Sequence, residues 1–549
     1  MCQRQRNNQG ETHTMLSKAL NQISYWFDLV ADHANPILVK ETRQALKGRQ
    51  FALTFILLLT ASWIISAGFA INAPEEIEYG AIAMDLFYAF YVVLAFAVVI
   101  VVPLGAFLSL SGENQENTFD LLSITTLNPT QIVRGKLEST LVQTLVYYSA
   151  IAPFMAFTAL LNGFDFLCCV FMLAITMVAS ITGSIFGLMM AAVMRSRRLQ
   201  SLMGLFWLLI VLGCLVTVYF WLLGGLSVLT RRPLPYGWEF WSVTAICCVG
   251  VGSYVVFLVQ ITASQLTFAS DNRTSGIRLT ASIQIMLYLM TIAFLTFYVM
   301  PPSSGRWTAD ETFTMTIPIL IHLAVIGLFQ VTQPNTLTQR TIRDLPTNPF
   351  LRFLWIPYLP GGTRGLLWLL VNALSIPLMH MSLLRLVTSS STAYTSTMIA
   401  ATAYIVIILG FGSLLGRWLF SKFSAIQPGH VRLTLIILVV ACIILPYVPF
   451  MLGLNYTSSG FTPLKILNPF ATLWAIGSSH STYGFLVPTL CLIAVLAVAA
   501  NGPAIVKDIQ QVQNAVPAVS DAVATEVDPL QPGQAVPQTS EVPQAEKPQ

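Results

Sequence analysis

The residues best suited to specific chemistry stand together at 113–140, where the chain reads ENQENTFDLLSITTLNPTQIVRGKLEST between two long apolar runs. Only 9% of all residues are charged, so this polar segment differs sharply from its surroundings. Its first part places Glu113, Glu116 and Asp120 on or near the first turn of a predicted short helix, where the helix dipole favours acids. This arrangement is typical of a segment that binds another molecule.

The same short helix is predicted to carry one apolar face. Its members are Phe119, Leu121, Leu122, Ile124 and Leu127. A helix that is apolar on one face, fixed by acids at one end and held between two membrane helices has the character of a docking site for a partner protein. The alternative is an interfacial helix whose apolar face lies in lipid.

A longer helix is predicted to follow at once. Asn128-Pro129, with Gln131 three residues past the cap, is a helix start. The helix protrudes from the membrane through Lys136 before it becomes a span. On this interpretation Lys136 is an exposed basic group near the rim of the docking contact.

Other chemistry finds little support in the sequence. The eight cysteines show no zinc spacing, and Met379-His380-Met381 point apart on a helix. No phosphate-loop motif occurs, because Gly135-Lys136 lacks both the upstream glycine and the following hydroxyl residue. We therefore expect no bound metal, no bound cofactor and no catalytic residue. The predicted spans also hold no Asp or Glu near their centres, which disfavours a proton-coupled carrier.

The elements that must position the segment are membrane helices. The 549 residues are 55% hydrophobic, the mean hydropathy is +0.71, and continuous apolar runs reach about 20 residues, which predicts spanning helices and not a barrel. The predicted fold is all-α and polytopic, with about twelve spans. They are 51–71, 84–110, 140–161, 166–194, 201–229, 240–269, 280–300, 313–331, 365–388, 393–416, 431–452 and 485–503.

The distribution of basic residues predicts the orientation, because Lys and Arg near span ends stay in the cytoplasm. With the N-terminus inside, five of the 28 Lys and Arg residues fall outside. These are Arg231, Arg232, Arg306, Arg385 and Lys465. Both termini are therefore predicted to be cytoplasmic.

The spans are predicted to form two halves, 51–270 with the coupling segment 113–137, and 271–503. Residues 464–477, LKILNPFATLWAIG, are too short to span and are expected to form a re-entrant or interfacial helix. Residues 504–549, a mixture of Pro, Gln, Val and Ala, are predicted to be a disordered cytoplasmic tail. Residues 1–50 are expected to hold a cytoplasmic leader and an amphipathic entry helix.

The entry helix is predicted to begin at Asn35-Pro36, a cap followed by a first helical position. Lys40, Arg43 and Lys47 line one of its faces. A basic face just before the first span suits a helix on the anionic inner leaflet. The alternative is a cytosolic helix whose charges are solvated.

The order of these elements resembles the permease subunits of type-two ATP-binding-cassette (ABC) exporters. The resemblance rests on residues 35–50, on Glu116-Asn117-Thr118-Phe119-Asp120-Leu121-Leu122 and on Ile132-Val133-Arg134-Gly135-Lys136-Leu137, and it covers about residues 35–230. The chain departs from the family at Asn117, where glycine is preferred, and in the position of Pro129.

The resemblance implies a function and a partner. The protein is expected to be a plasma-membrane permease subunit of an exporter, surrounded by lipid, with a separate ABC ATPase that uses the ATP and no nucleic-acid partner. The implied docking residues are Glu113, Glu116, Thr118, Phe119, Leu121, Leu122, Gly135 and Lys136. Two alternatives remain: a non-transporting scaffold or regulator, and a membrane-embedded enzyme using His480 and its neighbouring serines.

The predicted topology can be tested by cysteine labelling from outside in a variant that lacks the native cysteines. Probes at Ser304 and Ser458 should react, and probes at Ser275 and Thr347 should not, because the charge distribution places them inside. Reaction at Ser275 from outside would contradict the twelve-span arrangement.

Overall fold

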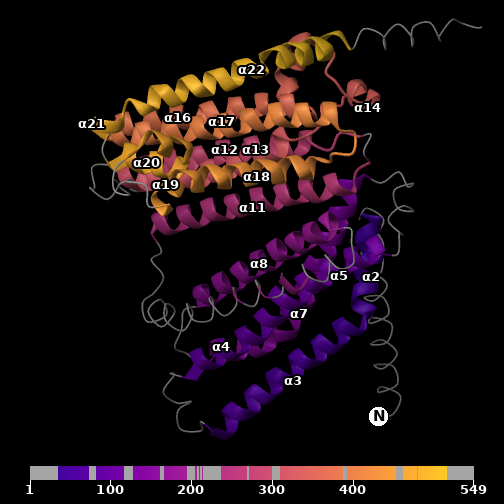
Figure 1. Ribbon diagram of the computed structural model, residues 1–549. Coiled ribbons are helices and arrows are strands. Elements are labelled where there is room, and N and C mark those ends of the chain that lie inside the picture. The colour runs from indigo at the N-terminus through magenta and orange to yellow at the C-terminus, as the bar shows by residue number, and fades with distance from the viewer. Residues whose placement is uncertain are drawn as a thin grey trace, which may run out of the picture.

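The computed structural model describes residues 35–72, 82–115, 128–160, 166–194, 204–206, 209, 213, 237–268, 271–299, 309–387, 392–452, 461–478 and 480–515. Every regular element in these ranges is helical (Figure 1). Eleven helical segments there are long and apolar enough to cross a membrane. The chain is thus an all-α polytopic membrane protein, as predicted. The remaining expected span, 201–229, lies almost wholly outside the described residues.

The first group of helices includes the entry helix and runs to residue 266. Its members are α2 (Pro36–Lys47), α3 (Arg49–Asn72), α4 (Ile82–Ala95), α5 (Val102–Gln115), α7 (Pro129–Leu160), α8 (Phe166–Val193) and α11 (Trp238–Leu266). A π-helical turn at Phe96–Val101 joins α4 to α5 in a single span. The predicted helix start at Asn128-Pro129 is confirmed, because α7 begins at Pro129 and continues into the membrane.

The second group consists of long helices with several short ones between them. The long members are α12 (Ser275–Phe294), α13 (Ala309–Val331), α16 (Gly362–Val387), α17 (Thr392–Lys422), α18 (Pro428–Ile444) and α22 (Leu486–Asn514). The short members are α14 (Gln339–Arg343), α15 (Pro349–Trp355), α19 (Val448–Met451), α20 (Pro469–Ser478) and α21 (His480–Tyr483). The expected short helix within 464–477 is present as α20.

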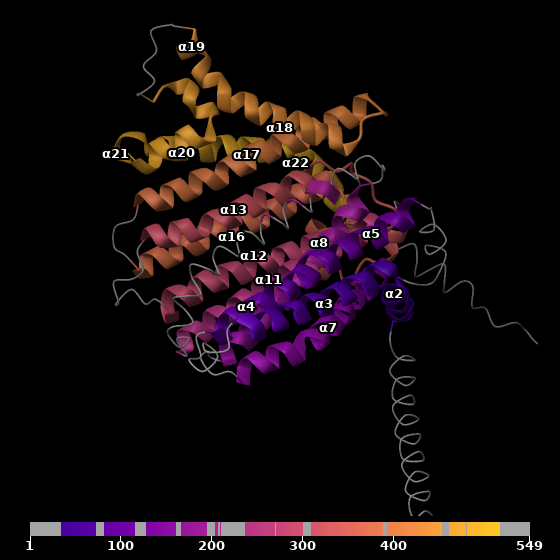
Figure 2. The same ribbon diagram turned by 90° about the horizontal axis from the view of Figure 1, so that it is seen from below.

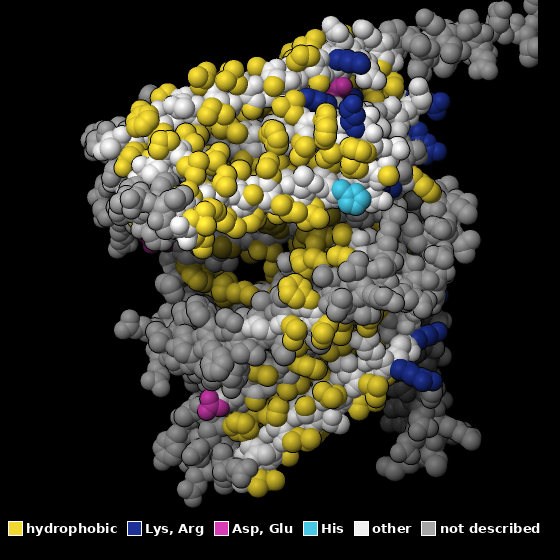
Figure 3. Space-filling view, viewed as in Figure 1, with side chains coloured by type: hydrophobic (Ala, Val, Ile, Leu, Met, Phe, Trp, Pro, Cys, Tyr) yellow, Lys and Arg dark blue, Asp and Glu magenta, His cyan; other side chains and the backbone are white. Residues whose placement is uncertain are grey.

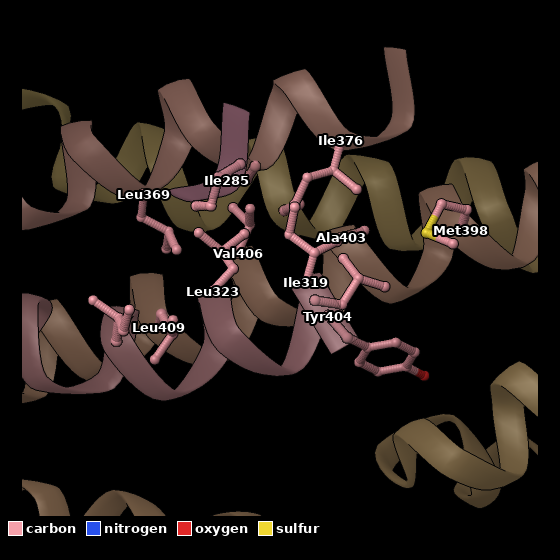
Figure 4. Packing of buried hydrophobic residues seen from close by; sticks show 14 of the residues in the cluster. Ile285, Ile319, Leu323, Leu369, Ile376, Met398, Ala403, Tyr404, Val406 and Leu409 are labelled. Carbon is pink, nitrogen blue, oxygen red and sulfur yellow. The ribbon is translucent and has the colours of Figure 1, made fainter. Parts of the chain in front are cut away.

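Each group has its own buried apolar core, and α11 contributes to both. The core of the second group is formed mainly by α12, α13, α16 and α17, where side chains such as Ile285, Leu323 and Leu369 interdigitate (Figure 4). On α11, Phe257 packs into this core, whereas Val259 and Ala263 pack against α5 and α8. Helix α11 is therefore shared by the two predicted halves.

Basic side chains gather at one end of the bundle. Figure 3 shows Lys and Arg at the end where α2 and α14 lie, while hydrophobic side chains cover the long sides of the helices. We call this end the α2 end. By the charge rule it is the predicted cytoplasmic side.

The turn before α16 closes the α2 end of the second group around one arginine. The Arg278 side chain of α12 is fully buried, and its guanidinium donates to the Pro357 carbonyl at 3.0 Å, the Gly361 carbonyl at 2.9 Å and Gln330 Oε1 at 2.8 Å. Gly361 has φ +129°, a backbone conformation that favours glycine. This arginine thus holds α12, α13 and the α16 turn together.

Helix α15 lies at the α2 end and exposes a row of large apolar side chains, Phe350, Leu351, Phe353 and Leu354. Its one charged residue, Arg352, is buried and donates to the Gln513 carbonyl of α22 at 2.9 Å. The arginine therefore fixes α15 to the bundle and leaves the apolar side chains pointing away from it.

Residue 504 does not begin a disordered tail, and that part of the prediction was wrong. Helix α22 continues through Pro503 to Asn514. Asp508 is buried, with Oδ2 3.7 Å from the buried Arg364 Nε, and Val512 is fully buried against Ile356 and Leu359. An apolar stripe and a buried acid give this extension enough contact to remain helical.

The extension of α22 yields a truncation test. A chain that ends at residue 515 keeps every described contact of α22 and should keep its thermal stability. A chain that ends at residue 503 loses Asp508 and Val512 and leaves Arg364 without its carboxylate, which should cost roughly 3 kcal/mol or more. The measurement is the midpoint of thermal aggregation in detergent. Equal midpoints for the two truncations would contradict the assigned role of the extension.

The structure also refines the labelling test. Ser275 is buried, and its hydroxyl donates to the Tyr358 carbonyl, so a cysteine there would be shielded on either side of the membrane. Thr347 and Thr336 are both exposed at the α2 end and are the better pair of inside probes.

Candidate functional site

The candidate site lies where α2, α5 and α7 meet at the α2 end, and Figures 1 and 2 both place α2 against the start of α7. The Asn35 side chain creates this contact. Its Oδ1 accepts from the Ile37 N–H at 3.1 Å, which caps α2, and its Nδ2 donates to the Gln131 carbonyl at 2.7 Å. One asparagine therefore begins α2 and joins it to the first turn of α7.

Gly135 permits the close approach of the two helices. A Cβ at this position would lie 2.9 Å from Ile37 Cβ and 3.0 Å from Asn35 Nδ2. Ile37 is buried at this contact, and Ile132 and Val133 of α7 are also buried, Val133 in the apolar cluster with α5, α8 and α11. Gly135 was predicted as a docking residue, and the structure places it inside this helix–helix contact.

Lys136 is the centre of the site. Its Nζ lies 3.0 Å from Glu41 Oε1, 3.1 Å from Glu113 Oε1 and 2.9 Å from Ser109 Oγ. These partners come from α2 and α5, and they occupy all three donors of the ammonium group. The lysine side chain is 4% exposed. The prediction of an exposed rim residue was therefore wrong, since Lys136 faces the interior where three helices converge.

The surroundings of Lys136 balance its charge. Ser109 donates to Glu41 Oε2 at 3.2 Å, and the exposed Lys40 lies 3.9 Å from Glu113 Oε1. Two carboxylates thus face two ammonium groups, one buried and one exposed. Burial of an unpaired ion costs several kcal/mol, so each member of the cluster depends on its partners.

The basic face predicted for the entry helix is confirmed as an exposed face. Lys40, Arg43 and Lys47 are all exposed on α2, and Lys40 also reaches Glu113. Sequence reasoning missed Glu41, the acid on the opposite face. The feature that could have revealed Glu41 is its position four residues after Ile37, which puts an acid on the apolar side of α2.

A half-open cavity of about 350 Å³ lies beside the cluster and is lined mainly by α2, α3, α5 and α7. Its polar lining includes Glu41, Gln44, Ser109 and Gln143. At its far end the Phe51 and Tyr147 rings pack with their centroids 5.3 Å apart. The cavity gives water and polar groups access to the helix junction.

The remaining predicted docking residues lie outside the described residues. They are Glu116, Thr118, Phe119, Leu121 and Leu122. Their segment, 116–127, is bounded by the end of α5 and the start of α7. Glu113 and Lys136 stand on these two helices and pair across the base of the segment.

No protein-family model, no curated protein and no solved structure matches the chain. The fold and the site define the chain as a polytopic helical membrane protein with a buried ionic junction at its basic end.

The ionic junction can be tested with a matched pair of lysines. Lys136→Met leaves the buried Glu41 and the partly buried Glu113 without their main cation, which should cost about 3 to 5 kcal/mol. Lys40→Met removes an exposed partner of the same Glu113 and should cost less than about 1 kcal/mol. Thermal aggregation midpoints in detergent measure both.

A further variant separates charge from packing. Adding Glu41→Gln to Lys136→Met should recover part of the loss, because one uncompensated buried charge is then removed. Equal midpoints for Lys136→Met and Lys40→Met would show that the junction does not stabilise the bundle.

Proposed function

We propose that this protein is an integral permease subunit of an ATP-driven exporter in the plasma membrane, energised by a separate ABC ATPase that docks on residues 113–127. The observation that carries the proposal is the junction at the base of that segment. Glu113 is the first residue of the segment, Lys136 follows the segment, and their side chains lie 3.1 Å apart in a largely buried cluster.

A docking segment needs a rigid base if it is to move membrane helices. Lys136 joins α5 to α7 through Glu113 and joins both to α2 through Glu41. A force applied to the segment is therefore applied to three helices together, two of which continue as spans. An interfacial helix that lies passively in lipid requires no such connection.

The proposal assigns different roles to the two sets of docking residues. Leu121 and Leu122 are the apolar residues that contact the ATPase. Lys136 and Gly135 are positioning residues, since their side-chain sites face Glu41 and Ile37 of α2. ATP is used by the partner, and this chain supplies the path through the membrane.

The contact can be tested by changing Leu121 and Leu122 together to Asp. If both leucines insert into a groove of the ATPase, the change removes apolar contact worth roughly 1.5 to 3 kcal/mol for each side chain and adds desolvated charge. Binding should fall by about two orders of magnitude or more. The measurement is recovery of the ATPase with the detergent-solubilised protein, alongside its size-exclusion profile.

A matched control is available at the same end of the bundle. Leu351 and Leu354 of α15 are 52% and 51% exposed, so changing both to Asp adds the same charges without disturbing a core. This control should retain the ATPase. If the Leu121/Leu122 variant is monodisperse and still binds at full level, the segment is not the dock. Loss of binding only in the α15 variant would place the dock on α15.

A further inference from the structure

A separate half-open cavity, of about 220 Å³, lies between α17, α18 and α22 in the second helix group. We call it the α18 groove. Its lining consists of aliphatic and aromatic side chains together with one proline and one cysteine. Ile408 of α17, Val439 and Cys442 of α18 and Ile493 of α22 stand on its walls. The groove is therefore apolar on all three of its helices.

A short 3₁₀ helix, Pro463–Leu467, closes the end of the groove that is farther from the α2 end. Its Ile466 side chain lines the groove, and the Ile466 carbonyl accepts from the Tyr404 hydroxyl of α17 at 2.7 Å. The next residue after this helix, Asn468, donates from Nδ2 to the Ile443 carbonyl of α18 at 3.0 Å. These two hydrogen bonds fix the closing segment to both α17 and α18.

The α18 groove lies within the predicted span region. The ends of α17 and α18 at Lys422 and Pro428 lie at the α2 end (Figure 1). At 1.5 Å per residue, Phe411 and Tyr404 lie about 16 and 27 Å along α17 from that end, and Cys442 lies about 21 Å along α18. A hydrocarbon core is about 30 Å thick. The groove is therefore at the depth of the lipid chains.

Water is poorly suited to fill this groove. A buried water needs two to four polar partners. The one hydroxyl on the lining, that of Tyr404, already donates to a backbone carbonyl, and no other side chain of the lining carries a nitrogen or an oxygen. Apolar walls without a neighbour lose their dispersion contacts. The groove thus favours an apolar occupant.

The groove opens onto the surface that faces the lipid. Phe411, Leu438 and Ile493 belong to its lining and are 45%, 40% and 38% exposed. Just outside it on the same helices, Ile437 of α18 and Leu492 of α22 are also exposed. Figure 3 shows hydrophobic side chains over α18 and α22 away from the α2 end. The apolar surface is therefore continuous from the lipid-facing helices into the groove.

We propose that the α18 groove binds one acyl chain of a membrane lipid, which enters between α18 and α22 and packs along α17. The groove covers α17 from Tyr404 to Phe411, a length of about 10 Å, so part of a chain lies in it and the remainder stays in the bilayer. The chain comes from lipid and not from water, so it is held by packing and not by the hydrophobic effect. The site is independent of the proposed ATPase dock.

The probe is a phosphatidylcholine that carries a photoreactive diazirine near the middle of one chain. The full-length protein is placed in phosphatidylcholine nanodiscs that contain this probe and is irradiated, and adducts are located by tandem mass spectrometry. Ile408 and Cys442, on two walls of the groove, should both carry adducts. Ile437, on the exposed face of α18, should also be labelled and reports ordinary contact with the bilayer.

Two matched pairs of variants separate the groove from ordinary lipid contact. Val439→Trp fills the groove from α18, whereas Val440→Trp adds the same ring at an exposed position beside it. Val439→Trp should reduce the adducts at Ile408 at least about fivefold, because the ring takes the space of the chain. Val440→Trp should leave them unchanged, and labelling of Ile437 should persist in both variants.

The second pair approaches from the opposite wall. Ile493→Trp fills the groove from α22 and should reduce the adducts at Cys442, whereas Leu492→Trp, at a position 60% exposed, should leave them unchanged. Size-exclusion profiles check the folding of all four variants. Because the two pairs are on different helices, a folding failure of one groove variant leaves the other to decide.

Three results would overturn the proposal. The first is the absence of adducts at Ile408 and Cys442 in a wild-type protein that is labelled at Ile437, which would leave a second copy of the chain as the occupant. The second is unchanged groove labelling in a folded Val439→Trp or Ile493→Trp variant. The third is rapid reaction of Cys442, as the single cysteine, with a small water-soluble thiol reagent in nanodiscs, which would show a groove filled with water. The first result needs no groove variant.

Discussion

The pairing of one buried ammonium group with two carboxylates organises the basic end of the first helix group. Lys136 is 4% exposed and uses its three donors on Glu41, Glu113 and Ser109. A lysine without partners would be strongly unfavourable at such a position, because burial of an unpaired ion costs several kcal/mol. The entry helix, the second span and the third span must therefore meet at this point for the charge to be accommodated. The cap at Asn35 and the close approach at Gly135 provide the geometry that makes the meeting possible.

A related solution holds the second helix group together. There a fully buried Arg278 binds backbone carbonyls of the turn before α16 together with Gln330. An ammonium group is a compact charge that suits carboxylates, whereas a planar guanidinium can satisfy several carbonyls at once. Both groups thus fix their helix ends at the α2 end with a buried cation, and they leave the membrane-embedded lengths to apolar packing. Helix α11 is the element that the two groups share, because it packs into both cores.

Among the described residues, α15 and the cavity between α11, α12 and α13 are two places that depart from the pattern of polar ends and apolar spans. At the α2 end, α15 exposes four large apolar side chains while its arginine is buried. Between α11, α12 and α13, a cavity deep in the span region keeps two polar atoms without partners. Each runs against the general tendency to expose charge and to satisfy buried polar groups.

The sequence by itself determined the class of fold and the positions of the eleven spans that the structure describes. Long apolar runs can only be spanning helices, because a backbone in lipid must satisfy its own hydrogen bonds. The start of α7 and of α2 was also readable, since Asn-Pro acts locally as cap and first turn. The distribution of Lys and Arg also predicted an orientation, because the rule depends only on single residues near the span ends.

Only the tertiary structure decided where the charges at those ends point. Lys136 lies next to a glycine on a protruding helix, and nothing local distinguishes an exposed lysine from one whose partners stand 23 and 95 positions away at Glu113 and Glu41. Asp508 likewise lies in the stretch that composition assigned to a tail, yet its partner Arg364 lies on another helix. Burial of a charge is set by long-range partners, and periodicity and composition register only neighbours along the chain. Local chemistry thus fixed which residues form helices, and packing decided which of their charges became structural.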